Sequence, residues 1–277
     1  SPFYDMLRYQ MGWIDERRQP EVSFVGDRVH GLMALLSAEA LSADFRCGLP
    51  VAAGIELACG FALVHDALRL GAPSTEYKPS LWWVWGHSQG INAGDGLYAL
   101  ARISVMRLEE KGASASMALR AAATLDQYCL VLCEKRYSAI ELEDGSGPSL
   151  RELLEIIDGT EGGLMACAME LGAISAGAGQ GLVEAFGSFG NKLGSARRLR
   201  QDVEMIWPVE GREKSHIIDE LDRKGSVPIT HACENAAKAD LELMNRVIAR
   251  EAPIQNDTID ALVGVLERTG SRAYLED

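Results

Sequence analysis

The sequence predicts an all-α protein, and three observations support this. Apolar residues recur at helical spacing along nearly the whole chain, and strand-like alternation is almost absent. The 277 residues are 47% hydrophobic and rich in Ala, Leu, Gly and Glu, a composition typical of packed helices. Helix-breaking residues gather in short clusters between the periodic segments. We therefore expect a single domain, residues 1–277, built as a bundle of about ten helices.

The first half of the chain contains five periodic apolar runs. They predict helices over residues 2–14, 27–43, 49–70, 89–111 and 115–136. The third run ends at the breaker cluster Gly71-Ala72-Pro73-Ser74. The segment Glu76 to His87, which contains Trp82, Trp83 and Trp85, is the longest expected non-helical stretch. Loops of this length in helical domains are often functional.

The second half continues the pattern after the cluster Asp144 to Pro148. Ser149 and Glu152 there form the Ser-x-x-Glu pattern of a capping box. The dipeptide Trp207-Pro208 breaks a long helix farther along. The expected helices cover residues 148–157, 161–176, 178–207, 212–223, 227–250 and 254–269.

The charge balance excludes two classes of partner. The formal net charge is −13, from 40 acidic and 27 basic residues, and such a surface repels nucleic acid and anionic lipid. The longest apolar stretch, Leu49 to Val64, is interrupted by Glu56, so we expect no membrane insertion. The N-terminus lacks the pattern of a secretory signal, and the six cysteines lack metal-finger spacing. We expect a cytoplasmic protein with reduced thiols.

An ordered series of short segments carries a resemblance to a known family. These segments are Gly26–Gly31, Glu56–Asp66, Arg69–Ser74, Gln89–Asp95, Leu171–Ala173, Phe189–Gly194, Asp202 with Trp207, and Lys214 to Pro228. In order and spacing they resemble the motifs of the trans-isoprenyl diphosphate synthases, or polyprenyl synthetases, within the class I terpene synthase superfamily. The resemblance implies an isoprenoid synthase-type bundle around a central cavity, an allylic diphosphate held through Mg²⁺, and usually a homodimer.

The resemblance makes Asp66 and Asp202 the candidate catalytic and metal-binding residues. In the family, two aspartate-rich helices face each other and bind Mg²⁺, which prefers hard oxygen ligands. Here the first motif reads Asp66-Ala67-Leu68-Arg69-Leu70 and the second reads Gln201-Asp202-Val203-Glu204-Met205. One aspartate remains in each, so we expect Mg²⁺ binding to be weak or lost. Mg²⁺ is the expected cofactor if the protein is active.

The basic residues that bind diphosphate in the family are also depleted. Forked guanidinium and ammonium donors suit phosphate. Asp27 stands where the family has Lys, and Thr160-Glu161 stands where it has a Lys-Thr pair. The diphosphate-binding candidates that remain by resemblance are Arg28, Arg69, Lys214 and Lys224.

Arg197-Arg198 replaces a Phe-Gln pair of the family just before the second motif. The two arginines either hold phosphate in a rearranged site or are solvated charges on a helix surface, and we favour the second reading. The glycines and apolar positions of the scaffold match the family well. The charged groups have gone from both sites, which is the pattern of a retained fold whose elongation chemistry was abandoned.

Two aromatic residues are cavity candidates. Phe61 lies five residues before Asp66, at a position that limits product length in the family. Ordinary core packing is the favoured reading of Phe61. Trp85, with its neighbouring tryptophans, either faces a carbocation, because aromatic rings attract positive charge, or is buried at an interface.

The leading hypothesis is a non-elongating, silent or regulatory partner of an active prenyl diphosphate synthase, in a homodimer or in a heterodimer with an active homologue. The alternative is a divergent class I terpene synthase that cyclises a single prenyl diphosphate, since cyclisation needs no isopentenyl site. A third reading is residual prenyltransferase activity with an unusual substrate. The charge inversions at Asp27 and Thr160-Glu161 argue against that reading.

Overall fold

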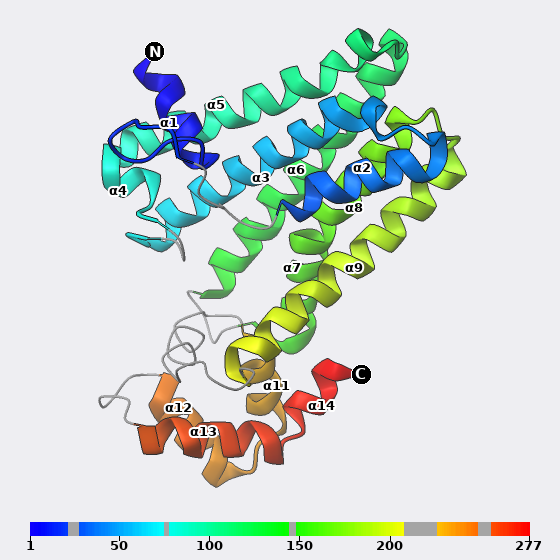
Figure 1. Ribbon diagram of the computed structural model, residues 1–277. Helices are drawn as coiled ribbons and strands as arrows, with labels where there is room; N and C mark the ends of the chain where they lie inside the picture. Colours follow the sequence, from blue (N-terminus) through cyan, green and yellow to red (C-terminus); the bar gives the residue numbers. More distant parts are fainter. Residues whose placement is uncertain (22–27, 75–77, 144–147, 208–225, 249–255) are drawn as a thin grey trace. The chain divides into compact units, whose positions relative to one another are not determined.

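The computed structural model describes residues 1–21, 28–74, 78–143, 148–207, 226–248 and 256–277 (Figure 1). Every regular element in these ranges is a helix, and only two isolated β-bridges, Ile14–Pro20 and Ser74–Pro79, accompany the helices. The all-α prediction is confirmed. The residue contacts divide the chain into two compact units, residues 1–130 with 163–191 and residues 131–162 with 192–277. The division falls within three helices, α6 (Ala115–Glu143), α8 (Glu161–Ser175) and α9 (Gln180–Ile206).

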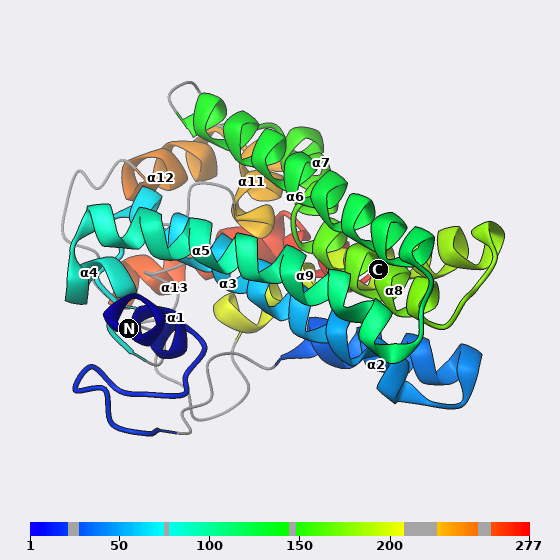
Figure 2. The same cartoon turned by 90° about the horizontal axis from the view of Figure 1, so that it is seen from above.

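The first unit is built around two long helices. In Figures 1 and 2, α3 (Leu49–Leu70) and α5 (His87–Met106) run side by side. Pro50 stands in the first turn of α3, where its missing N–H is harmless, and Gly71 ends the helix with φ +62°. The segment Phe45–Leu70 is long and apolar enough to cross a membrane, but 61% of its most apolar 18-residue stretch is buried inside the protein. We read α3 as a core helix.

Small residues allow close packing in this unit. Its core contains alanines from α2 (Val29–Ser42), α3, α5, α6 and α8 (Glu161–Ser175), together with larger side chains such as Ile55 and Leu125. A Cβ on Gly172 of α8 would lie 2.2 Å from the carbonyl oxygen of Ala34 in α2. Only glycine permits this approach. The short elements α1 (Pro2–Gln10), η1 (Phe45–Gly48), α4 (Leu81–Trp85) and η2 (Arg107–Lys111) complete the unit.

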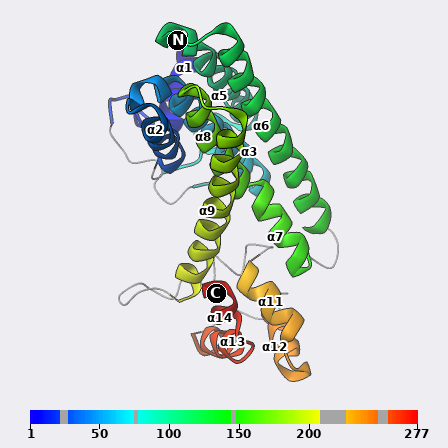
Figure 3. The ribbon, with the colours of Figure 1, turned by 90° about the vertical axis from the view of Figure 1, so that its right-hand side faces the viewer.

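The second unit contains the C-terminal helices. Figure 3 shows α11 (Val227–Asn235), α12 (Lys238–Ile248), α13 (Asn256–Arg268) and α14 (Ser271–Glu276) grouped together. They bury Met244, Leu262 and Leu266 in a common core. Their neighbour α7 (Leu150–Gly159) begins at the predicted capping box, in which Ser149 and Glu152 bond each other's backbone N–H groups.

Several predicted elements differ from the structure, and α6 extends to Glu143, beyond the expected end at residue 136. The expected helix 227–250 is two helices, because Ala236 adopts an extended conformation after α11. The short α14 was not expected, and the expected helix 212–223 lies outside the described residues. The three tryptophans belong to the helical turns of α4 instead of a loop. Tertiary contacts stabilise this short helix, since the Trp82 indole N–H donates to the Ala72 carbonyl oxygen at 3.0 Å.

Candidate functional site

Asp66, the first metal candidate, lies in the last turn of α3. Its carboxylate is about one-third exposed, and its Oδ1 lies 4.0 Å from Nε of Arg69, one turn later on the same helix. The sequence predicts these two residues as a metal ligand and a diphosphate ligand. Their proximity follows from the i, i+3 spacing on a helix. Each therefore already has an oppositely charged neighbour.

His65, beside Asp66, contacts the neighbouring helix α5. Its Nε2 lies 3.7 Å from Oδ1 of Asp95, and the Asp95 side chain is largely exposed. A Cβ on Gly94 would lie 2.2 Å from the same Nε2. Gly94 thus provides the space in which the His65 imidazole lies. Gly94 and Asp95 of α5 both contact this side chain of α3.

Phe61, the cavity candidate one turn earlier, is buried among aromatic rings. Its ring packs edge-on against His65 at 4.9 Å and lies 5.5 Å from the ring of Tyr98 in α5. The Tyr98 hydroxyl donates to Asp126 at 2.8 Å, and burial with this bond raises the pKa of Tyr98 to about 12. Trp85 lies apart from this cluster and packs edge-on against Tyr9 at 4.8 Å.

Arg28 connects the N-terminal segment to α3. Its Nη2 donates to the Met11 carbonyl oxygen at 2.5 Å, and its Nη1 lies 3.7 Å from Glu56 Oε2. The other Glu56 oxygen accepts the backbone N–H of Gly31 at 2.7 Å. Arg28 also has φ +50°, a left-handed conformation that disfavours side chains with a Cβ. The guanidinium is thus engaged by protein oxygens.

Asp202, the second metal candidate, is fully buried in α9 of the second unit. Its Oδ1 forms an ion pair with Nη1 of Arg198, which lies one turn earlier on the same helix. Its Oδ2 accepts the backbone N–H of Val227, at the start of α11, at 3.4 Å. The carboxylate therefore faces a guanidinium on one side and the positive end of a helix on the other.

Arg198 has a second acidic neighbour. Its Nε lies 3.8 Å from Glu161 Oε1, and Thr160 Oγ1 donates to the other Glu161 oxygen at 2.5 Å. The Arg198 side chain is only 12% exposed. The interpretation of Arg198 as a solvated surface charge is therefore wrong. Sequence spacing placed it on α9 but gave no information about which face of that helix is buried.

Residues 13–266 match the model of a protein family that is described as polyprenyl synthetase. The chain belongs to the polyprenyl synthetase family. It is 27% identical to the (2E,6E)-farnesyl diphosphate synthase of Mycobacterium tuberculosis over 97% of this chain and 74% of that protein. It is 28% identical to a geranylgeranyl diphosphate synthase of the same organism over 88% of this chain and 69% of that protein. A polyprenyl synthetase structure from Streptomyces coelicolor A3(2) superimposes with a TM-score of 0.88 at 29% identity, covering 99% of this chain and 81% of that one.

The groups around Asp202 do not suit Mg²⁺, the metal that the family implies. Mg²⁺ demands near-octahedral oxygen coordination and keeps several waters, whereas the Asp202 carboxylate is buried and faces a guanidinium. Within the described ranges, no group of three or more His, Cys, Asp or Glu side chains is placed to hold a metal. The diphosphate-binding candidates Lys214 and Lys224 lie outside the described residues. The same is true of Asp27, which stands where the family has a lysine.

Sequence reasoning missed a lysine beside Arg28 in the first unit. Lys78 Nζ donates to the Tyr9 carbonyl oxygen and lies 4.1 Å from the centre of the Tyr9 ring. Burial lowers the pKa of Lys78 to about 8. Lys78 lines a pocket of about 340 Å³ with three acidic residues, Asp15, Glu16 and Glu21. Lys78 precedes Pro79 in a segment without helical periodicity, so its burial could not be predicted from the sequence.

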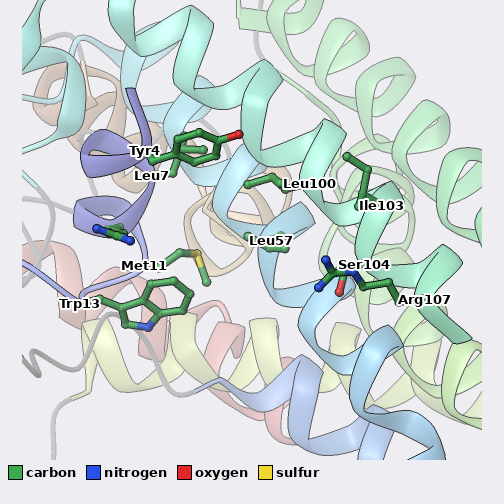
Figure 4. Close-up of a pocket in the computed structure, with 10 residues that line it drawn as sticks. Tyr4, Leu7, Met11, Trp13, Leu57, Leu100, Ile103, Ser104 and Arg107 are labelled. Carbon is green, nitrogen blue, oxygen red and sulfur yellow. The ribbon is translucent and has the colours of Figure 1, made fainter. Parts of the chain in front are cut away.

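An apolar groove opens between α1, α3 and α5. Figure 4 shows Tyr4, Leu7 and Met11 on one side and Leu57, Leu100 and Ile103 on the other, around about 270 Å³ of space. Trp13 at its edge is 57% exposed. The charged residues that line it are Arg8 and Arg107. The groove lacks the carboxylates that metal-assisted chemistry needs.

Proposed function

We propose that this member of the polyprenyl synthetase family does not elongate prenyl chains and acts as a silent or regulatory partner of an active prenyl diphosphate synthase. The observation that carries the proposal is the ion pair between Asp202 and Arg198. A carboxylate neutralised by its own helix is a poor ligand for the metal that would hold a leaving diphosphate. The lone Asp66 beside Arg69 supports the same reading.

The isopentenyl site supports the proposal independently. Arg28 donates to the Met11 carbonyl oxygen and pairs with Glu56, so both of its terminal nitrogens contact protein oxygens. Glu161, which stands where the family has a basic-hydroxyl pair, adds negative charge near Arg198. Each of these features, taken by itself, disfavours the binding of a second diphosphate. The relatives are named as farnesyl and geranylgeranyl diphosphate synthases, and the proposal concerns the residues in which this chain departs from the motifs of its family.

The proposal extends to the domain organisation, the oligomeric state and the cellular location. We propose that residues 1–277 act as one isoprenoid synthase-like domain, to which both contact units belong. Homodimers are usual in the family, and an active homologue would replace one protomer in a heterodimer. We propose a cytoplasmic location, where both prenyl diphosphates and such a homologue would be found.

The decisive experiment incubates the pure protein with Mg²⁺ and geranyl, farnesyl or geranylgeranyl diphosphate, each alone and with isopentenyl diphosphate. We expect neither pyrophosphate release nor a longer product. Co-expression with active synthases of the same organism should then give a stable heteromer with an altered product length. Elongation by the pure protein would refute the proposal. A homodimer that forms no heteromer with any active homologue would refute the partner role.

A second candidate function is a class I terpene synthase that cyclises one prenyl diphosphate. The aromatic cluster of Phe61, His65 and Tyr98, next to Asp66, favours it because such rings attract a carbocation. In this reading Asp66 binds the metal, Arg69, Lys214 and Lys224 hold the diphosphate, and Phe61 and Trp85 line the cavity. A cyclic hydrocarbon from a single diphosphate, lost in Asp66→Ala, would establish this function and end the silent-partner proposal.

A further inference from the structure

The second aspartate motif contains a cation that the chain supplies itself. Arg198 and Asp202 are four residues apart on α9, the spacing at which two side chains meet on one helix face. Asp202 is fully buried and Arg198 nearly so. A buried carboxylate without a compensating charge is strongly disfavoured, because it loses its hydration. The Arg198 guanidinium therefore supplies a compensating positive charge beside the buried Asp202 carboxylate.

The surroundings of the pair resemble those of a bound cation. Arg198 contacts carboxylates from two segments, Asp202 on α9 and Glu161 at the start of α8, as a metal ion would bridge them. The remaining Asp202 oxygen accepts the N–H of Val227. The carboxylate thus also joins α9 to α11, next to the small core of Val227, Leu153 and Ile157.

We propose that the Arg198 guanidinium is a built-in cation that takes the place of a divalent metal ion at Asp202. Asp202 is then a structural counter-ion, and the motif position is closed to Mg²⁺ by the chain itself. The inference deepens the proposed function but is tested by metal binding and stability, without any substrate. If the protein proved to be an active enzyme, the proposed function would fail while this inference would stand or fall on its own measurements.

The test compares Mn²⁺ binding, by calorimetry and by electron paramagnetic resonance, in the wild type and in Arg198→Gln. The wild type should show no Mn²⁺ site that depends on Asp202. Arg198→Gln leaves the carboxylates without their cation, and its Mn²⁺ affinity should rise at least about tenfold. The rise should disappear in Arg198→Gln/Asp202→Asn.

A matched control is available on the same helix. Arg200 pairs with Glu204 at 2.8 Å with the same i, i+4 spacing, but its side chain is 79% exposed. Arg200→Gln should change neither Mn²⁺ affinity nor the melting temperature by a measurable amount. Arg198→Gln should lower the melting temperature by roughly 6 °C or more, and Mn²⁺ should restore part of that loss.

A further variant covers the case in which Arg198→Gln does not fold. In Arg198→Met/Asp202→Leu both charges are replaced by apolar groups, and this variant should fold with a melting temperature near that of the wild type. If it is as unstable as Arg198→Gln, the two groups do not compensate each other and the inference is wrong. Mn²⁺ binding by the wild type that is lost in Asp202→Asn would overturn it as well.

Discussion

The His65 imidazole and the Asp95 carboxylate approach to 3.7 Å and connect α3 to α5, which run side by side. Gly94, next to Asp95, leaves the space that the imidazole fills. The contact lies directly beside Asp66, so the packing of these two helices also fixes the orientation of the first motif.

Gly94→Ala should destabilise the protein. The new methyl group would lie 2.2 Å from His65 Nε2, so the imidazole must move, and we expect a loss of about 1–3 kcal/mol in the free energy of unfolding. Urea unfolding measures this loss. The control is Gly181→Ala in α9, where a Cβ would meet nothing within 4 Å and stability should stay unchanged or rise. In a His65→Ala background, Gly94→Ala should cost little further stability, and a cost that persists there would assign the loss to another contact.

Lys78 should give the protein a distinct pH dependence. Its pKa of about 8 in the folded state lies below its ordinary value of about 10.4, so the unfolded chain binds the proton more tightly. Stability from this residue therefore rises as pH increases from about 8 to about 10.4. Urea unfolding between pH 7.5 and 9.5 should show a more positive slope in the wild type than in Lys78→Met. Equal slopes would mean that Lys78 titrates as an exposed lysine.

Ser149→Ala should raise the pKa of Glu152. The Ser149 hydroxyl and backbone N–H donate to the Glu152 carboxylate at 2.7 and 2.9 Å, and these bonds lower the Glu152 pKa. Because the pKa is lower in the folded state, this contribution to stability is present above about pH 4.3 and is lost as pH falls through the folded pKa. An NMR titration should show Glu152 moving toward its ordinary value in the variant. Glu155, which pairs with Arg151 at 3.0 Å, is the internal reference.

Restoring the first motif should restore metal binding without elongation. In Ala67→Asp/Leu70→Asp, the carboxylates at 66 and 70 share one face of α3, and calorimetry should show Mg²⁺ affinity at least about tenfold higher. Asp66→Asn in the same background should remove the gain. The changes at Asp27 and Glu161 remain, so no longer prenyl diphosphate should form. Elongation by the restored variant would show that the isopentenyl site works after all.

The sequence predicted the helices that its own periodicity defines and missed those that depend on tertiary contacts. The predicted bounds of α3, 49–70, agree with the structure because Pro50 and Gly71 mark both ends. No glycine or proline marks the helix break at Ala236. The helix α4 is too short to show a periodic pattern of apolar residues. Secondary structure of that kind is decided by packing against distant residues.

The candidate site was predictable as a set of positions but not as a set of interactions. Asp66 and Asp202 were found from the order and spacing of their motifs. That Asp202 is buried, and that Arg198 turns toward it, depends on which face of α9 the second unit covers. Lys78 shows the same limit, since a lysine after a breaker cluster reads as a surface residue until its surroundings are known.

The Arg198–Asp202 pair also has a consequence for how the protein responds to its environment. A metal ion stabilises a fold by mass action, so its contribution changes with the concentration of free ion around the protein. The Arg198 guanidinium is covalently part of the chain, so its contribution to stability does not depend on the concentration of any free ion. The junction between α9 and α11 therefore keeps the same strength when cellular Mg²⁺ is depleted or abundant, and chelators should have no access to it.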